Sequence, residues 1–289
     1  MDILVKRIAA ILSCLCLSTA ALAADWEGPQ EPFALHGNSY YVGTQGLSAV
    51  LLTSPAGHIL IDGAGPKTPL QIAAHIRQLG FKVEEIKFIL TSHEHLDHAG
   101  GIGELQRLSG ATVLTSPAAK PVLESGVTDK ADPQFSSNLP NMTPVAKVKT
   151  VRDGEIVTLG PLAIKAHYTP GHTQGGISWT WQSVENGKTL NMVYADSLNA
   201  VAGPNFRYSG NALYPQAKRD IERSIALVAA LPCDILVSAH PDAIKLIERQ
   251  AHVKQLGSAA FIDRDGCRKY AETGRKRLAE TLAKEAAAR

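Results

Sequence analysis

The stretch that decides the fold is His93-Glu94-His95-Leu96-Asp97-His98. Its spacing brings together three imidazoles and the Asp97 carboxylate, which suit a borderline metal ion that prefers nitrogen and oxygen ligands. Residues two apart face away from each other on an α-helix, so a single helix cannot direct His93 and His95 at one ion. The stretch therefore predicts a loop, and we expect Gly100-Gly101 to turn the backbone sharply before the next helix begins.

Two further histidines follow predicted strands elsewhere in the chain. His172 lies in the turn after residues 162–168, and His240 directly follows the apolar residues 234–239. Four ligands in one short loop are too many for a single ion with an open position, so they divide between two neighbouring ions that each need another ligand. We therefore predict a set of six metal ligands: His93, His95, Asp97, His98, His172 and His240. The histidines that lack ligand spacing are His36, His58, His75, His167 and His252.

The order of the predicted elements indicates two similar parts. Each part begins with short β-rich segments and ends with helices, which is typical of two sheets packed face to face with helices outside. We predict an α/β fold of this kind, a four-layer αβ/βα sandwich; a doubly wound parallel sheet is the alternative, which the hairpin-rich segments disfavour. The expected strands are residues 39–42, 48–53, 58–62, 86–91, 112–115, 149–151, 155–159, 162–168, 176–182, 190–194 and 234–239. The expected helices are residues 68–79, 102–108, 118–125, 216–231, 243–255 and 264–284.

Several side chains have roles that their neighbours suggest. Residues 126–144 are polar and rich in Asn, Pro and Ser, which predicts a long loop or flap, and its one aromatic residue, Phe135, is either a packing residue or lines the substrate cleft. Asp62 follows an apolar strand, and we expect it to hydrogen-bond the histidine loop rather than to bind metal. The tryptophans are expected to be packing residues: Trp26, Trp179 and Trp181.

The beginning of the chain differs from the rest. A basic pair precedes an apolar run over residues 8–17, and small residues then end in Ala21-Leu22-Ala23. This order is typical of a secretory signal peptide, and the apolar run is shorter than the roughly 20 residues that span a bilayer. We predict a signal peptide over residues 1–23, a single domain over residues 24–289 and export to the periplasm. A buried N-terminal helix is the other interpretation.

The composition is that of an ordinary globular protein with a core, because 45% of the residues are hydrophobic and 19% are charged. The net charge of +2 argues against a basic surface for nucleic acid or an anionic membrane. Loss of the signal peptide leaves only Cys233 and Cys267 of the four cysteines. One such pair in an exported protein predicts a disulfide, with two separate buried thiols as the alternative.

The sequence resembles the metallo-β-lactamase superfamily, which is defined by the His-x-His-x-Asp-His loop. It is most similar to class B metallo-β-lactamases of the third subclass, whose second zinc is held by histidine and not by cysteine. The resemblance implies the αβ/βα sandwich of that superfamily, and Cys233 and Cys267 match the disulfide of the subclass. The matching segments cover nearly the whole mature chain: residues 61–63, 91–101, 168–173, 194–198 and 231–241.

The resemblance assigns two zinc ions to each chain. The ligands that it implies for the first zinc are His93, His95 and His172. Those that it implies for the second zinc are Asp97, His98 and His240. Zinc lowers the pKa of its bound water to about 7, and Asp97 would orient the resulting hydroxide as ligand and hydrogen-bond partner.

The resemblance also implies roles for residues beside the metals. Ser197 and Asn199 match substrate-binding positions, although serine is common in the subclass where Asn199 stands. In related hydrolases an aspartate in this segment bridges the metals, whereas here we expect Asp196 to support a ligand instead.

The activity that the resemblance implies is hydrolysis of the β-lactam amide bond of penicillins, cephalosporins and carbapenems, which gives antibiotic resistance. We expect a periplasmic monomer that acts on a small molecule and binds neither nucleic acid nor, after signal removal, a membrane. The alternatives are another dinuclear metallohydrolase of this fold, such as a lactonase or thioester hydrolase, and a non-catalytic metal-binding protein. Export disfavours a cytosolic thioester substrate, and the intact ligand set disfavours the non-catalytic alternative.

Overall fold

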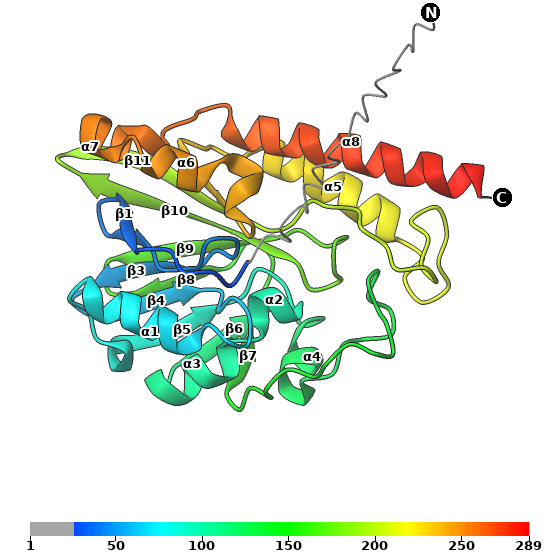
Figure 1. Ribbon diagram of the computed structural model, residues 1–289, viewed down its shortest axis with the longest axis horizontal. Coiled ribbons are helices and arrows are strands. Elements are labelled where there is room, and N and C mark those ends of the chain that lie inside the picture. Colours follow the sequence, from blue (N-terminus) through cyan, green and yellow to red (C-terminus); the bar gives the residue numbers. More distant parts are fainter. Residues whose placement is uncertain (1–25, 289) are drawn as a thin grey trace, which may run out of the picture.

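The computed structural model describes residues 26–288, so the signal peptide predicted over residues 1–23 lies outside the described part. Within that part the strands form two sheets that face each other (Figure 1). The seven-stranded sheet follows chain order: β1 (Phe33–His36), β2 (Ser39–Tyr41), β3 (Val50–Ser54), β4 (Gly57–Ile61), β5 (Ile86–Leu90), β6 (Thr112–Thr115) and β7 (Val148–Thr150). The five-stranded sheet has the order β12-β11-β10-β9-β8, with β8 (Ile156–Leu159), β9 (Leu162–Tyr168), β10 (Ile177–Glu185), β11 (Lys188–Ala195) and β12 (Ile235–Ser238).

Helices cover the outer face of each sheet (Figure 1). Those of the first part are α1 (Pro69–Gln78), η1 (Val83–Glu85), α2 (Leu96–Ala99), α3 (Ile102–Ser109) and α4 (Lys120–Ser125). Those of the second part are α5 (Ala217–Ala230), η2 (Pro241–Ile244), α6 (Leu246–Gln250), α7 (Val253–Leu256), η3 (Gly257–Phe261) and α8 (Gly266–Ala287). The long helices α5 and α8 lie side by side over the second sheet, opposite α1 and α3 on the first.

Alternating residues of the central strands divide the core into layers. In β4, Ile59 belongs to the core between the sheets, whereas its neighbour Leu60 packs with the helices outside. In β11, Tyr194 faces inward in the same way and Val193 packs under α5 and α8. Successive strand residues point to opposite faces, so a strand buried on both faces is a continuous apolar run. This pattern explains why the central strands were predictable from the sequence.

The predicted αβ/βα sandwich is confirmed, and the doubly wound parallel alternative is wrong. Strands β8 to β11 pair antiparallel, as do β1 to β4, whereas β4 to β7 pair parallel. Four two-residue connections, which join β1 to β2, β3 to β4, β8 to β9 and β10 to β11, account for the hairpin pattern of the sequence.

Two element predictions differ from the structure. The helix expected over residues 243–255 is broken into η2, α6 and α7, because Lys245 adopts a φ of 56° that a right-handed helix cannot continue through. Strand β1 has no counterpart among the predicted strands. Residues 126–144 contain no helix or strand, as expected for the flap.

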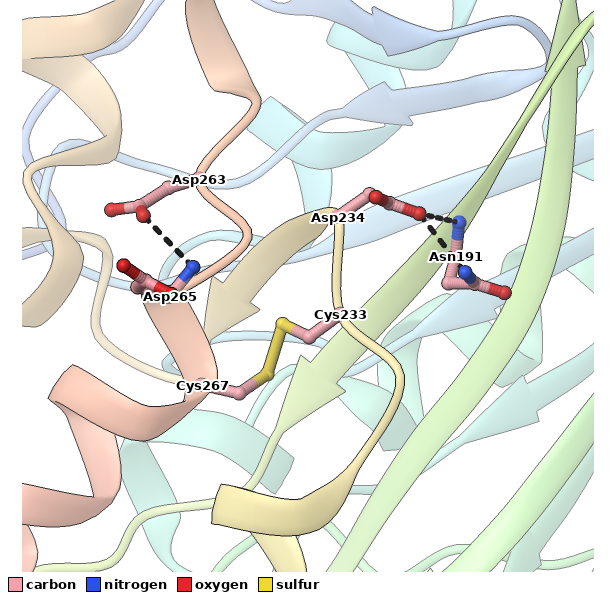
Figure 2. The surroundings of a disulfide bond; sticks show 6 residues. All are labelled: Asn191, Cys233, Asp234, Asp263, Asp265 and Cys267. Carbon is pink, nitrogen blue, oxygen red and sulfur yellow. Dashed lines mark hydrogen bonds between the residues drawn. A yellow bond between two sulfur atoms is a disulfide. The ribbon is translucent and has the colours of Figure 1, made fainter.

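The predicted disulfide is confirmed (Figure 2). Cys233 lies two residues before β12 and Cys267 lies in the first turn of α8, so the bond ties the end of the second sheet to the helix that covers it. Beside it, Asp234 accepts hydrogen bonds from the backbone and side-chain nitrogens of Asn191 on β11, both at 2.9 Å (Figure 2). The loop before β12 is therefore fixed from two sides.

No helix within residues 26–288 combines the length and the apolar character needed to cross a membrane. Even α8, which has 22 residues, carries charged side chains along most of its length.

Candidate metal centre

The histidine loop begins where β5 ends, and Asp62 fixes its first residue. The Asp62 carboxylate accepts hydrogen bonds from the backbone nitrogen and the hydroxyl of Ser92, each at 2.6 Å, and from the hydroxyl of Tyr194 at 2.8 Å. Trp179 donates its indole N–H to the Thr91 carbonyl at 2.9 Å. The expected role of Asp62 is confirmed: this buried carboxylate links the loop to the second sheet.

The backbone of the loop is only partly as predicted. His93 to His95 are non-helical, but Leu96 to Ala99 form one helical turn, α2, which carries Asp97 and His98. His93 and His95 both lie before this turn in non-helical backbone, which resolves the problem that a single helix could not direct both of them at one ion. Gly100 and Gly101 form the predicted turn before the next helix, but their φ values of −59° and −83° are open to any residue, so the turn itself does not require glycine.

The glycines serve close packing instead. A Cβ on Gly101 would collide with the carbonyl oxygen of Gly63, and one on Gly100 would lie 2.9 Å from Cδ of Pro66. The segment after β4 thus presses directly on the end of the histidine loop. Only glycine leaves room for that approach.

The first group of side chains that could hold a metal ion is His93, His95 and His172, whose ligand atoms all lie within 4.8 Å of one another. The Nδ1 atom of His93 lies 2.8 Å from Oδ1 of Asp196, while its buried Nε2 has no hydrogen-bond partner within the described residues. An orphaned ring nitrogen of this kind is what a metal ligand presents when its other nitrogen is held by a carboxylate.

The other two histidines of this group are held in the same manner. Nε2 of His95 lies 2.9 Å from a carboxylate oxygen of Asp132, a buried residue of the flap. Nδ1 of His172 lies 2.7 Å from the backbone oxygen of Asn199. In each ring one nitrogen is fixed by an acceptor, so the other nitrogen is left for a ligand bond.

The second group gathers around Asp97. Its Oδ2 lies 3.2 Å from Nε2 of His98 and 3.5 Å from Nε2 of His240, and the two ring nitrogens are 3.2 Å apart. Nδ1 of His240 lies 3.1 Å from the backbone oxygen of Gly46. His93 also lies within 4.8 Å of Asp97 and His98, so the two groups adjoin each other. All six predicted ligands therefore meet in one place.

The electrostatics keep most of these rings neutral, which is the form that binds metal. Burial, reinforced by neighbouring histidines, holds the pKa of His93 well below its usual range and lowers the pKa of His172 to about 3. Burial also lowers the pKa of His240. Burial opposes ionisation of Asp97, but His98 and the other imidazoles outweigh it and lower the pKa of this carboxyl.

His95 differs from the other histidines. Burial alone would lower its pKa, but the hydrogen bond and charge of Asp132 raise the pKa above the ordinary value. The donor set, nitrogen and carboxylate oxygen with neutral rings and a free buried nitrogen, fits a metal ion of zinc type.

The metal groups open into a cleft of about 410 Å³. Ser197 and Asn199, the predicted substrate-binding residues, both line it. Phe135 is not among its lining residues, and the flap contributes Gln134 instead. Its full lining is Trp26, His95, Asp97, Gln134, His172, Ser197, Asn199, Val201, His240, Asp242, Ala243, Tyr270 and Arg277.

Sequence reasoning missed several residues of the site. Trp26 is not a packing residue, since 48% of it is exposed and its ring centroid lies 4.8 Å from that of His240. Glu94 is buried and accepts hydrogen bonds from the Thr173 hydroxyl at 2.9 Å and the Gly175 nitrogen at 3.2 Å, which ties the histidine loop to the turn of His172. No feature of the sequence distinguishes Asp132 from the other polar residues of the flap. Glu94 could have been noticed as a carboxylate inside the motif.

Two adjoining groups of side chains that could hold metal ions, in an αβ/βα sandwich, are typical of a metal-dependent hydrolase. Residues 42–185 match the family described as the metallo-beta-lactamase superfamily. MEM-A1, a subclass B3 metallo-beta-lactamase from a soil metagenome library, is 64% identical with a TM-score of 0.90, over 92% of this chain and 100% of that chain. The metallo-beta-lactamase SMB-1, solved with 2-mercaptoethanesulfonate, is 50% identical with a TM-score of 0.87, over 90% and 99%. The chain belongs to the metallo-β-lactamase superfamily and, within it, to subclass B3.

Curated relatives with another activity are more distant. The hydroxyacylglutathione hydrolase of Maricaulis maris is 25% identical over 156 residues, which are 54% of this chain and 46% of that protein. The Brucella ovis protein of the same description is 30% identical over 108 residues, which are 37% of this chain and 33% of that protein. The chain thus spans less than half the length of the curated relatives it matches.

Proposed function

We propose that this chain hydrolyses the amide bond of β-lactams with two zinc ions. The observation that carries the proposal is the meeting of six predicted ligands in one cleft of a chain 64% identical to a subclass B3 metallo-beta-lactamase. The proposed ligands of the first zinc are His93, His95 and His172. The proposed ligands of the second zinc are Asp97, His98 and His240.

The protein residues would position the reactants. When bound, the zinc ions supply a nucleophile at neutral pH and polarise the lactam carbonyl. Asp97, ionised because His98 lowers its pKa, would orient the attacking water by accepting a hydrogen bond at its carboxylate oxygen, and the proton that the water loses would pass to the ring nitrogen as it leaves. The carbonyl carbon gains the hydroxyl, the C–N bond breaks, and the ring nitrogen takes up a proton. No covalent bond to the enzyme is required.

Other residues of the cleft would hold the substrate. Ser197 and Asn199 follow β11 directly and line the cleft beside His172, where they can donate hydrogen bonds to a carboxylate. Trp26 offers an exposed ring next to His240, which suits contact with the apolar part of a bicyclic substrate. Penicillins, cephalosporins and carbapenems share the ring amide and the neighbouring carboxylate, so we include all three as substrates.

The remaining features of the proposal concern the cell. We propose that residues 1–23 are a signal peptide, that residues 24–289 form a single domain, and that this monomeric enzyme works in the periplasm and gives antibiotic resistance. Cys233 and Cys267 support this location, since disulfides persist in oxidising compartments.

A second candidate is a thioester or lactone hydrolase of the same fold, which the match to hydroxyacylglutathione hydrolases favours. The purified mature protein would be assayed with a penicillin, a cephalosporin, a carbapenem, a glutathione thioester and an acyl-homoserine lactone. We expect turnover of the lactams that EDTA abolishes and zinc restores. Turnover of the thioester or lactone without the lactams would replace the first proposal by the second, and no metal-dependent turnover at all would contradict both.

A further inference from the structure

The metal cleft continues along α8 into a second hollow of about 610 Å³. Residues 199–204 form one wall of this hollow and the second half of α8 forms the other. Three residues line both the cleft and the hollow: Asn199, Val201 and Arg277. Arg277 therefore stands where the two spaces join.

The segment that carries the predicted substrate-binding residues lies along α8. The Tyr270 hydroxyl donates a hydrogen bond to the backbone oxygen of Asp196 at 3.0 Å, and the Thr281 hydroxyl donates one to the backbone oxygen of Ala200 at 2.8 Å. These two bonds hold both ends of residues 196–200 against the helix. Ser197 and Asn199 belong to this segment and so lie beside α8.

Helix periodicity puts Arg277 on the same stripe of α8. Positions 270, 274, 277 and 281 are separated by four, three and four residues, which is the spacing of one helix face. Between the two anchoring residues, Gly274 packs so closely on Leu198 that an added Cβ would lie 3.0 Å from it. Arg277 is the next residue of that stripe, so its side chain leaves α8 beside Asn199.

The charge of Arg277 is available in the cleft. Arg277 is exposed and is the one lysine or arginine among the residues that line the cleft in the described part of the chain. The basic residues of α8 that pair with carboxylates are Arg268, Lys269 and Arg275, and Arg277 takes part in none of these ion pairs. The carboxylates of the cleft lining are Asp97, a proposed metal ligand, and Asp242.

We propose that Arg277 binds the carboxylate that β-lactams carry beside the ring nitrogen. This inference rests on the proposed lactam hydrolysis. A guanidinium group presents two parallel N–H donors that match a carboxylate, and a carboxylate held at Arg277 would lie next to the hydroxyl of Ser197 and the amide of Asn199. The ring amide is then directed toward the metal ligands at the other side of the cleft.

The test compares Arg277→Ala with Arg275→Ala on the same helix, using a penicillin and its methyl ester. Arg275 pairs with Glu272 and lies off the stripe, so its removal changes the net charge equally without reaching the cleft. For the free acid we expect Arg277→Ala to raise KM about tenfold while kcat changes little, since a group that holds ground state and transition state alike affects KM alone. For the ester, Arg277→Ala should have the same KM and kcat as the unsubstituted enzyme.

Arg277→Lys keeps the positive charge but loses the two parallel N–H donors of the guanidinium group. Its KM for the free acid should lie between those of the unsubstituted enzyme and Arg277→Ala. If the enzyme hydrolyses the penicillin but Arg277→Ala behaves as Arg275→Ala, or raises KM equally for acid and ester, the role of Arg277 is wrong and the proposed activity stands. If the unsubstituted enzyme with zinc turns over neither compound, the proposed activity fails, and this inference fails with it.

Discussion

At the scale of single residues, Asp132 fixes the ring of His95, one of the predicted metal ligands. It is a buried carboxylate in a flap without helix or strand, and it lies 2.9 Å from the ring nitrogen of His95. Its own position is set locally, because its other carboxylate oxygen accepts a hydrogen bond from the Gln134 nitrogen at 2.6 Å. An acceptor of this kind fixes the ring orientation of a metal-binding histidine and increases its basicity.

We therefore predict that Asp132→Asn weakens zinc binding by roughly 10- to 100-fold with little change in fold. The amide removes the charge that raises the pKa of His95 and weakens the hold on its ring. Competition with a chromophoric chelator measures the affinity directly. Asp129→Asn is the matched control, since Asp129 lies in the same flap, is exposed, and its carboxylate accepts a hydrogen bond from the nearby Ala131 nitrogen at 2.8 Å, whereas only its backbone oxygen bonds Asp132. Equal affinities of the two variants would contradict the prediction.

The central residues of the site were predictable because their signal is local. The spacing from His93 to His98 carries the chemistry within one short stretch, and His172 and His240 each follow a strand. Asp132 gave no signal, because its partner is 37 residues away and the flap has no periodicity. Trp26 was misjudged for a similar reason: its position over His240 depends on a long-range contact that no pattern records.

At the scale of elements, the start of α8 is fixed to the second sheet and to the loop before the helix. The Cys233–Cys267 bond joins its first turn to β12, and Asp263 contacts Arg249 at 2.8 Å and Lys269 at 3.0 Å. Asp263 also accepts a hydrogen bond from the Asp265 nitrogen at 3.1 Å (Figure 2). These contacts set the direction of the helix whose opposite half bounds the cleft.

The disulfide should contribute to global stability. Replacing both cysteines by alanine is expected to lower the free energy of unfolding by about 3 to 4 kcal/mol, because the unfolded chain loses the constraint of a 34-residue separation. Urea unfolding, followed by circular dichroism, measures the loss. Dithiothreitol should destabilise the unsubstituted protein to a similar degree and leave the alanine variant unchanged. A reductant effect that persists in the variant would show that another cause is at work.

Asp263 should make part of the stability depend on pH. Burial favours its protonated form, but the hydrogen bonds from Arg249 and Lys269 outweigh burial and lower its pKa. A carboxyl whose pKa is lowered by folding stabilises the protein above its unfolded pKa, and this stability is lost as the pH falls through the folded value. We expect Asp263→Asn to cost about 1 kcal/mol at pH 7 and less below pH 4. Parallel stability curves for both proteins from pH 3 to pH 7 would refute this, with Asp265→Asn as the exposed control.

Element boundaries were predictable where a strand alternates buried and exposed residues, and they failed where the backbone conformation of a single residue decides. The strand over residues 162–168 was predicted with its observed bounds. The helix over residues 243–255 was not, because the left-handed backbone of Lys245 breaks it and nothing in the residue type requires that conformation. The turn at Gly100 and Gly101 was predicted, but the reason for glycine was not: the close approach of the segment after β4 requires it, and the φ of Gly101 does not.

At the scale of the whole molecule, the metal centre joins the two halves. The histidine loop leaves the first sheet, whereas His172 and His240 come from the second. Beside the centre, the Ser48 nitrogen donates a hydrogen bond to the Ala239 carbonyl at 3.0 Å, across the two halves. Any ion that binds here is held by both sheets at once.

Metal removal should therefore destabilise the entire domain. With zinc at about 1,000 times its Kd, binding adds about 4 kcal/mol, which corresponds to a Tm increase of roughly 10 °C over the apo protein. Differential scanning calorimetry with EDTA and with added zinc measures the difference. His240→Ala should show a smaller increase, whereas His252→Ala, an exposed histidine outside the centre, should match the unsubstituted protein. A single transition that does not respond to zinc would argue against a centre shared by both halves.

The division of the chain between the sheets has a further consequence. Every strand of the first sheet precedes Val151, and every strand of the second follows Glu155, with an exposed turn at Asp153-Gly154 between them. A chain split at that turn would yield two fragments, each holding one complete sheet with its covering helices. Neither fragment alone would contain all six proposed ligands, and neither could bury the inner face of its sheet. Zinc would thus act as a reporter of fragment complementation, retained only when the two pieces reassociate.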